Sequence, residues 1–147
     1  MITVLLADDH ILVRDALCYL LEAQGDIKII ATAADGQEAV EQAKRLCPDI
    51  AVLDISMPRM DGIEAARRIC ETCSKTRIVM LTIYHTEEHV RHAVQAGASG
   101  FVLKDAAGQE LVAAVRTLHD GGRYFSSKID QLVEHKKKQT GQNLLDP

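Results

Sequence analysis

Three carboxylates, a hydroxyl and an ammonium group stand at the ends of four apolar, β-branched runs of this chain. The runs are Ile2–Ala7, Ile50–Leu53, Ile78–Leu81 and Phe101–Leu103, and the polar residues are Asp8, Asp9, Asp54, Thr82 and Lys104. If the runs are parallel strands of one sheet, these side chains meet at its carboxyl edge, where open α/β sheets bind ligands. Such a set of groups is suited to holding a divalent cation beside a phosphoryl group.

The acidic residues predict a metal site. Asp8 and Asp9 are consecutive at one strand end, and Asp54 comes from another strand. Carboxylates crowded into one cleft disfavour one another's ionised form unless a cation is present. Hard oxygen ligands suit Mg²⁺, which often shares its coordination sphere with a phosphate. We therefore expect Mg²⁺, or Mn²⁺, at this place.

Asp54 is the candidate nucleophile. A carboxylate can attack phosphorus to give an aspartyl phosphate, and the loop after Asp54 leaves room for the incoming group. Because phosphoryl transfer depends on positioning and charge, Lys104 is expected to pair with one phosphoryl oxygen and the Thr82 hydroxyl to donate to another. A lone Asp at a strand end is more often a helix cap, so the prediction depends on all five residues meeting at one edge.

Strand-like and helix-like segments alternate five times along the chain. The strand-like runs are Ile2–Ala7, Ile27–Ala33, Ile50–Leu53, Ile78–Leu81 and Gly100–Lys104. One helix-like segment follows each run; the segments are Leu12–Ala23, Asp35–Leu46, a helix beginning at Asp61-Gly62, Thr86–Ala96 and Gln109–His119. This alternation predicts right-handed crossovers and a parallel sheet covered on both faces. We predict an α/β fold with a five-stranded, doubly wound, flavodoxin-like sheet of order 2-1-3-4-5 and five flanking helices, whose switch point lies beside Asp54.

Residues 123–147 differ from the α/β domain predicted for residues 1–122. Ser127–Asp130 fits a capping box with Asp in place of Glu, which predicts a short linker helix followed by a tail. Lys136-Lys137-Lys138 suits the negative end of that helix dipole. We interpret the lysine run as a solvated helix end, with a nucleic-acid contact as the minority alternative.

Composition restricts the possible partners. The 147 residues are 47% hydrophobic and 26% charged with a net charge of −4, which argues against a duplex-binding face. No apolar stretch approaches the ~20 residues that span a bilayer, and the N-terminus has no signal-peptide pattern. We therefore expect a cytoplasmic protein with no membrane contact.

Two other groups of metal-ligating residues are interpreted as structural. Cys70 and Cys73 have C-x-x-C spacing, but no second cysteine pair accompanies them. His85, His89 and His92 lie at helical spacing, where a solvated polar face is the simpler interpretation.

The motifs around the five polar residues resemble the receiver domain of bacterial two-component response regulators, most closely that of the NarL/FixJ (LuxR-type) subgroup. The resemblance covers residues 1 to about 122 and rests on three motifs in order, Ala7–His10, Leu53–Gly62 and Ala96–Asp105. It implies that Asp54 is phosphorylated by a sensor histidine kinase. It also implies Asp9, Asp54 and the backbone carbonyl of Ser56 as metal ligands, with Asp8 acting through water.

The resemblance further implies how phosphorylation is transmitted. Thr82 and Phe101 form a switch pair, in which Thr82 moves toward the phosphate and the Phe101 ring turns inward, while Lys104 pairs with the phosphoryl group. Ile83 stands where receivers often have a smaller residue, so we expect slow loss of the phosphoryl group. Phosphorylation is expected to produce a homodimer, with the first and fifth helices as the first candidate face.

Receivers of this subgroup regulate transcription through a helix-turn-helix domain that follows a linker, and the sequence of that domain is absent here. We therefore expect this chain to be a piece of a longer regulator, which contacts DNA only through the absent domain and is no enzyme beyond its own phosphorylation and dephosphorylation. One alternative is an aspartyl-phosphate phosphatase, but such enzymes resemble D-x-D where this chain has Asp54 and Ser56. Another is a phosphorylation-independent interaction module, in which we would expect one of the five residues to be lost.

Overall fold

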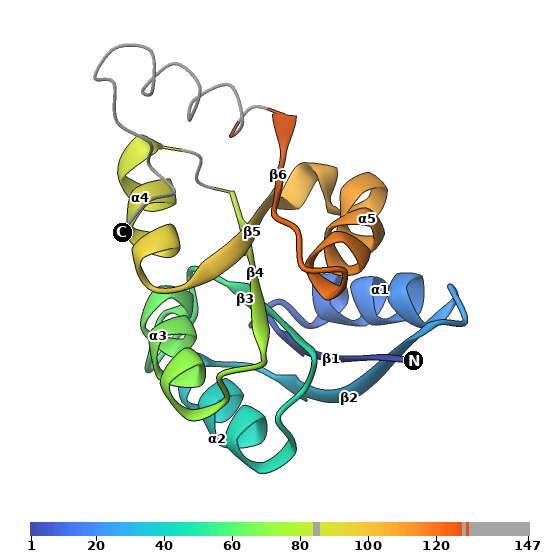
Figure 1. Cartoon of the computed structure of the whole chain (residues 1–147), viewed down its shortest axis with the longest axis horizontal. Helices are drawn as coiled ribbons and strands as arrows, with labels where there is room; N and C mark the ends of the chain where they lie inside the picture. The colour runs from blue at the N-terminus through green and yellow to red at the C-terminus, as the bar shows by residue number, and fades with distance from the viewer. Residues whose placement is uncertain (84–85, 128, 130–147) are drawn as a thin grey trace.

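A parallel β-sheet runs through the middle of the molecule, with helices on both faces (Figure 1). The structure is a computed structural model that describes residues 1–83, 86–127 and 129. Its strands are β1 (Ile2–Ala7), β2 (Ile27–Ala33), β3 (Ile50–Asp54), β4 (Arg77–Thr82), β5 (Ala98–Leu103) and β6 (Tyr124–Phe125). The spatial order is β2-β1-β3-β4-β5-β6, and the α/β fold with the predicted order 2-1-3-4-5 is confirmed.

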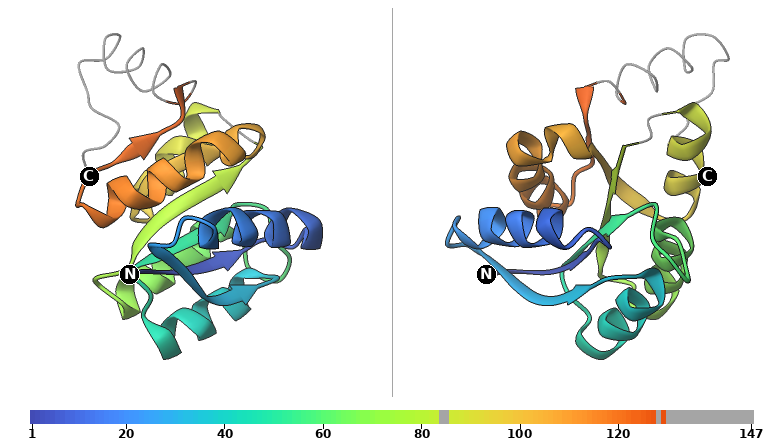
Figure 2. Two further views of the ribbon diagram at one scale, coloured as in Figure 1. Left: turned by 90° about the vertical axis from the view of Figure 1, so that its right-hand side faces the viewer. Right: turned by 180° about the vertical axis from the view of Figure 1, so that it is seen from behind.

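Among the described residues, five α-helices cover the sheet, as predicted. They are α1 (Ile11–Glu22), α2 (Gly36–Leu46), α3 (Gly62–Thr72), α4 (Glu87–Gln95) and α5 (Ala107–His119), and a 3₁₀ turn, η1 (Lys104–Ala106), precedes the last. Buried residues of α1 and α5 pack in one cluster on one face, and those of α2, α3 and α4 pack in another on the opposite face (Figure 2). None of the helices within residues 1–83 and 86–127 is both long enough and apolar enough to span a bilayer.

The core follows from apolar runs that are buried on both faces of the sheet. Ala51, Val52 and Leu53 in β3 are fully buried, as expected for a central parallel strand. In α5, the residues at helical spacing on the inner face are also fully buried, namely Leu111, Ala114, Val115 and Leu118.

The first helix is less predictable from its pattern. Leu12 and Tyr19, which lie at helical spacing, are 85% and 81% exposed, while Leu17 and Leu21 make the buried contacts. Apolar residues occur on more than one side of α1, so periodicity alone does not identify the packed face.

The sheet also differs from the prediction by one strand. β6 pairs in parallel with β5, with Gly100 opposite Tyr124 and Phe101 opposite Phe125. The Ser126 backbone N–H donates to the Phe101 carbonyl at 2.9 Å, and the Ser126 hydroxyl accepts from the Leu103 N–H at 3.1 Å. Two residues are too few to show strand periodicity, so this edge strand had no sequence signal. Residues 128 and 130–147, which carry most of the predicted linker helix and tail, lie outside the described residues.

Candidate functional site

Strand register brings the predicted polar residues to one edge of the sheet. Ala7 lies opposite Leu53 and Thr82 opposite Leu103, so neighbouring strands end nearly level. Asp8 and Asp9 follow β1, Asp54 is the last residue of β3, and Thr82 is the last of β4. Lys104 opens η1 directly after β5, one residue later than the strand end itself. The predicted convergence at the carboxyl edge is therefore present in the structure.

Lys104 connects the two buried carboxylates. Its Nζ donates to Asp54 Oδ2 at 2.9 Å and lies 3.2 Å from Asp8 Oδ2. The side chains of Asp8 and Asp54 are 0% and 3% exposed, and that of Lys104 is 14% exposed. One ammonium group thus pairs with two buried carboxylates.

Burial and charge both influence the ionisation of this pair. Burial acts to lower the pKa of Lys104, but hydrogen bonds with Asp54 and Asp8 and their negative charges outweigh it, so the pKa is raised. Burial raises the pKa of Asp54; the Lys104 hydrogen bond opposes this, and the charge of Asp8 adds to it. Because the three carboxylates of Asp8, Asp9 and Asp54 gather around this one ammonium group, the site is short of positive charge.

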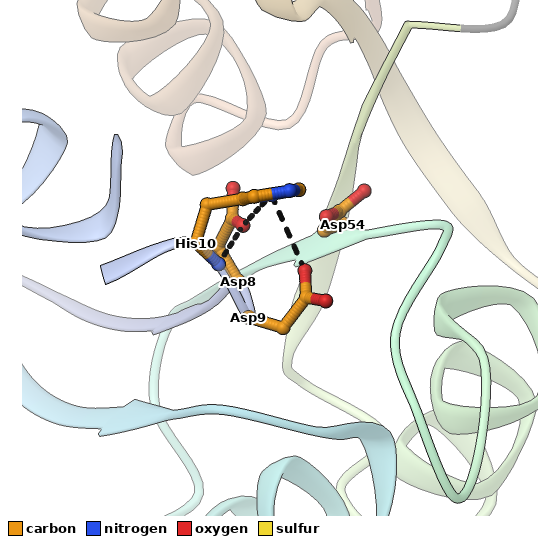
Figure 3. A group of neighbouring side chains, drawn as sticks. All are labelled: Asp8, Asp9, His10 and Asp54. Carbon is orange, nitrogen blue, oxygen red and sulfur yellow. Dashed lines mark hydrogen bonds and ion pairs between the residues drawn. The ribbon is translucent and has the colours of Figure 1, made fainter. Parts of the chain in front are cut away.

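His10 is a member of the site that sequence reasoning did not assign a role, although it follows Asp9 directly. Its Nδ1 lies 3.2 Å from Asp8 Oδ1 and 3.3 Å from Asp9 Oδ1. Figure 3 marks the contacts of His10 with these two carboxylates as dashed lines. The same nitrogen is 3.2 Å from Lys104 Nζ. The His10 backbone N–H also donates to Asp8 Oδ1 at 2.9 Å, which fixes one oxygen of that buried carboxylate.

The residues present fit a divalent cation. Asp8, Asp9, His10 and Asp54 each offer one ligand atom, and these atoms lie within 4.8 Å of one another. Asp8 Oδ2 is buried and accepts no hydrogen bond from the described residues, although Lys104 is near. Buried carboxylate oxygens are rarely left without a partner. An oxygen-rich donor set of this kind suits Mg²⁺, and a cation or its water would satisfy the remaining oxygen.

The loop between β3 and α3 forms one wall of the site. Its Ser56 N–H donates to Asp54 Oδ1 at 3.2 Å, so the loop directly holds the oxygen that Lys104 does not. The Ser56 carbonyl, expected as a metal ligand, belongs to the same loop.

The two predicted switch residues are both buried. Thr82 is 1% exposed at the end of β4, and Phe101 is fully buried in β5 opposite Met80. The Phe101 ring belongs to the apolar cluster on the α2, α3 and α4 face. Phe101 is thus part of the core.

The two cysteines outside the site contact two different segments. Cys73 Sγ donates to the Ala43 carbonyl of α2 at 3.2 Å, whereas Cys70 Sγ is 4.0 Å from the Gly97 carbonyl after α4. Burial, followed by a hydrogen bond with Cys47, raises the pKa of Cys73 to about 11. These contacts agree with a structural interpretation. Of the three histidines, His85 lies outside the described residues.

A doubly wound parallel sheet with an acidic cluster and a lysine at its carboxyl edge defines the receiver class of α/β domains. The chain belongs to the family described as "Response regulator receiver domain", whose sequence model matches residues 4–116. The family consists of the response regulators of two-component systems, and the relatives of this chain are of the LuxR/NarL type and regulate transcription.

Individual relatives support this placement. The chain is 39% identical over 145 residues to the transcriptional regulatory protein LiaR of Bacillus subtilis (strain 168), covering 99% of this chain and 69% of that protein. It is 37% identical over 139 residues to the oxygen regulatory protein NreC of Staphylococcus haemolyticus (strain JCSC1435), covering 90% of this chain and 64% of NreC.

A solved structure is similarly close. A LuxR-family two-component response regulator from Aurantimonas sp. SI85-9A1 superposes with a TM-score of 0.89 at 33% identity, covering 94% of this chain and 99% of that one. The chain thus spans only about two thirds of the curated relatives it matches, but nearly all of this solved structure.

Proposed function

We propose that Asp54 accepts a phosphoryl group from a sensor histidine kinase in a Mg²⁺-dependent reaction, and that the modified aspartate acts as a signal. The observation that carries this proposal is the buried Asp54 carboxylate, held 2.9 Å from Lys104 Nζ within an under-neutralised acidic cluster. Membership of the receiver family supports phosphorylation-dependent signalling as the general function.

The proposed transfer is a single displacement at phosphorus. An Asp54 carboxylate oxygen attacks the phosphorus of a phosphohistidine, the new O–P bond forms, and the P–N bond breaks. The bonding electron pair remains on the imidazole nitrogen of the kinase, and because the other ring nitrogen of the phosphohistidine carries a proton, the histidine leaves as neutral imidazole. Because little covalent chemistry is needed, the contribution of this chain is to position Asp54 and to balance the charge.

Asp9, Asp54 and the Ser56 carbonyl are the residues we propose as direct metal ligands, with Asp8 acting through water. When bound, Mg²⁺ (or Mn²⁺) supplies charge neutralisation at a phosphoryl oxygen. Lys104 is already placed between Asp54 and Asp8 and is proposed to transfer its hydrogen bond to a second phosphoryl oxygen.

Thr82 and Phe101 are proposed to convert the modification into a change of surface. Thr82 is the last residue of β4 and lies opposite Leu103, the residue before Lys104. From there its hydroxyl is proposed to donate to the phosphoryl group. Phe101 lies in β5, whose backbone is hydrogen-bonded to Ser126 beyond β6. A shift at Phe101 would therefore reach the segment that leads out of the domain.

The output proposed for the whole protein is transcription regulation in the cytoplasm. We assign residues 1–122 to the receiver domain and residues 123–147 to a linker, with phosphorylation favouring a homodimer. DNA contact is assigned to a helix-turn-helix domain outside this chain, in keeping with the greater length of the relatives.

The chemistry of the site favours storage of the phosphoryl group over turnover of a substrate. Aspartyl-phosphate phosphatases need an acid–base carboxylate two residues after the nucleophile, and Ser56 stands there. We therefore propose that the protein is a regulator that catalyses only its own phosphorylation and dephosphorylation.

Intact-mass measurement tests the proposal. The chain is incubated with Mg²⁺ and acetyl phosphate, alongside Asp54→Asn and, as a matched control, Asp61→Asn, in which an exposed helix cap is changed. We expect one added phosphoryl group in the wild type and Asp61→Asn, and none in Asp54→Asn. Donor consumption far beyond this labelling would support an enzyme, and the absence of labelling would support a phosphorylation-independent module.

A further inference from the structure

An ion pair outside the acidic cluster joins the loop between β3 and α3 to the neighbouring helix α2. Arg59 Nε donates to Asp35 Oδ2 at 2.8 Å, although the two residues are 24 positions apart. The Asp35 side chain is 5% exposed, and its other oxygen accepts from the Glu38 N–H at 2.8 Å as the cap of α2. Asp35 is therefore fixed to the first turn of α2 and offers Arg59 a rigid anchor.

The ionisation of Asp35 agrees with this geometry. The hydrogen bond from the Glu38 N–H, followed by that from Arg59, lowers the pKa of Asp35. The carboxylate is thus charged at neutral pH, and its interaction with the guanidinium is charge-assisted.

The same loop is pressed closely against α2. A Cβ atom added to Gly36, the first residue of α2, would lie 2.0 Å from the Met60 carbonyl oxygen. The Met60 N–H also donates to the Pro58 carbonyl at 2.7 Å, which closes a three-residue turn centred on Arg59. The loop therefore has a defined path past α2.

The backbone at Arg59 gives no reason for an arginine at this position. Its φ of 66° lies in the left-handed region, where glycine is the residue with the least strain. Since the turn would form more readily with glycine, the function of Arg59 lies in its side chain, and the contact of that side chain is Asp35.

We infer that Arg59 is a positioning residue for the metal site, acting through the loop that carries Ser56. The ion pair holds this loop against α2, and the loop in turn brings the Ser56 N–H to Asp54 and carries the carbonyl proposed as a metal ligand. This inference rests on the proposed function. Its consequence is that metal affinity depends on a side chain that contacts no proposed metal ligand and acts through the backbone of the loop.

The test measures Mg²⁺ affinity by isothermal titration calorimetry on residues 1–147, together with the thermal midpoint of the metal-free protein. Arg59→Gly removes the ion pair and fits the left-handed turn, so we expect affinity to fall by about tenfold while the midpoint is unchanged or higher. Arg59→Lys keeps a charge that can reach Asp35 and should recover most of the affinity. Arg68→Ala is the matched control, because Arg68 pairs with Glu64 at 3.0 Å on the exposed side of α3 and should leave affinity within about twofold of wild type.

The possible outcomes distinguish a failure of the positioning role of Arg59 from a failure of the proposed phosphorylation of Asp54. If the wild type binds Mg²⁺ and is labelled on Asp54, but Arg59→Gly binds Mg²⁺ as tightly, the positioning role is wrong and the proposed function stands. The positioning role is also wrong if Arg59→Gly loses thermal stability to the same extent as Mg²⁺ affinity. It is wrong as well if Arg68→Ala shows the same fall in affinity. If the wild type neither binds Mg²⁺ nor is labelled, the proposed function fails and the inference fails with it.

Discussion

Replacement of Asp54 by asparagine should stabilise the metal-free protein, even though it removes a buried ion pair. The ligand oxygens of Asp8 and Asp54 lie within 4.8 Å, so their repulsion is at least about 3.5 kcal/mol at an effective dielectric constant of 20. Asp9 adds a smaller repulsion, because its side chain is 34% exposed. The attraction of Asp54 to Lys104 at 2.9 Å is about 5.7 kcal/mol on the same scale.

These repulsions offset more than half of the attraction, and the cost of burying the Asp54 charge opposes the remainder. Asparagine keeps the shape and an acceptor oxygen for Lys104, so we expect a gain of about 1 kcal/mol in the free energy of unfolding, or roughly 2–4 °C in the thermal midpoint. Lys104→Met should act in the opposite direction, with a loss of about 3 kcal/mol, because it leaves two buried carboxylates without their cation.

Urea unfolding followed by circular dichroism at neutral pH tests this, once with EDTA and once with Mg²⁺. With Mg²⁺ at a hundred times its dissociation constant the wild type should gain about 2.7 kcal/mol, while Asp54→Asn gains much less, so the order of stability reverses. If Asp54→Asn is less stable than the wild type in EDTA by more than about 1 kcal/mol, the site is not short of positive charge and the reasoning is refuted.

Three further predictions concern the surroundings of the site. Gly36→Ala places a Cβ atom 2.0 Å from the Met60 carbonyl and should cost about 1–3 kcal/mol in urea unfolding. Gly108→Ala, where the added atom meets nothing within 4 Å, should be neutral or stabilising, and equal effects of the two changes would contradict the packing argument. Asp35→Asn keeps the helix cap but loses the charge, so it should be less stable than the wild type at neutral pH. In the folded protein the pKa of Asp35 lies below its ordinary value of 3.8. The stability advantage of the wild type should therefore be complete above pH 3.8 and disappear as the pH falls through the lower pKa of the folded protein. Urea unfolding of both proteins from neutral pH to about pH 3 measures the difference, and an advantage that acid leaves unchanged would contradict the ion pair. Ile83, which follows Thr82 and is 66% exposed, is expected to shield the phosphoryl group from water. Ile83→Ala should therefore shorten the lifetime of the phosphoryl group after the donor is removed, as measured by intact mass. A lifetime in the variant equal to or longer than that in the wild type argues against shielding.

The convergence of Asp8, Asp9, Asp54 and Lys104 could be predicted because it depends on strand order alone. Apolar runs that alternate with helices predict parallel strands, and parallel strands place their carboxyl ends at one edge. Nothing about the side chains beyond their position at a strand end was needed for this step.

Other features depend on tertiary contacts that have no local pattern. The pairing of Arg59 with Asp35 requires a left-handed turn at an arginine, which residue preferences do not predict. The contacts of His10 depend on where the chain leaves β1. The strand β6 is a two-residue edge strand and takes its hydrogen bonds from β5, so only the folded sheet identifies it.

Mapping of the modified residue shows directly whether Asp54 is the phosphorylated side chain. The chain is incubated with acetyl phosphate and Mg²⁺, reduced with borohydride, which converts an aspartyl phosphate to homoserine, and digested for tandem mass spectrometry. The account predicts homoserine at position 54 alone, and its loss when EDTA replaces Mg²⁺. Homoserine at another aspartate, or modification of Asp54 that does not depend on the metal, would contradict it.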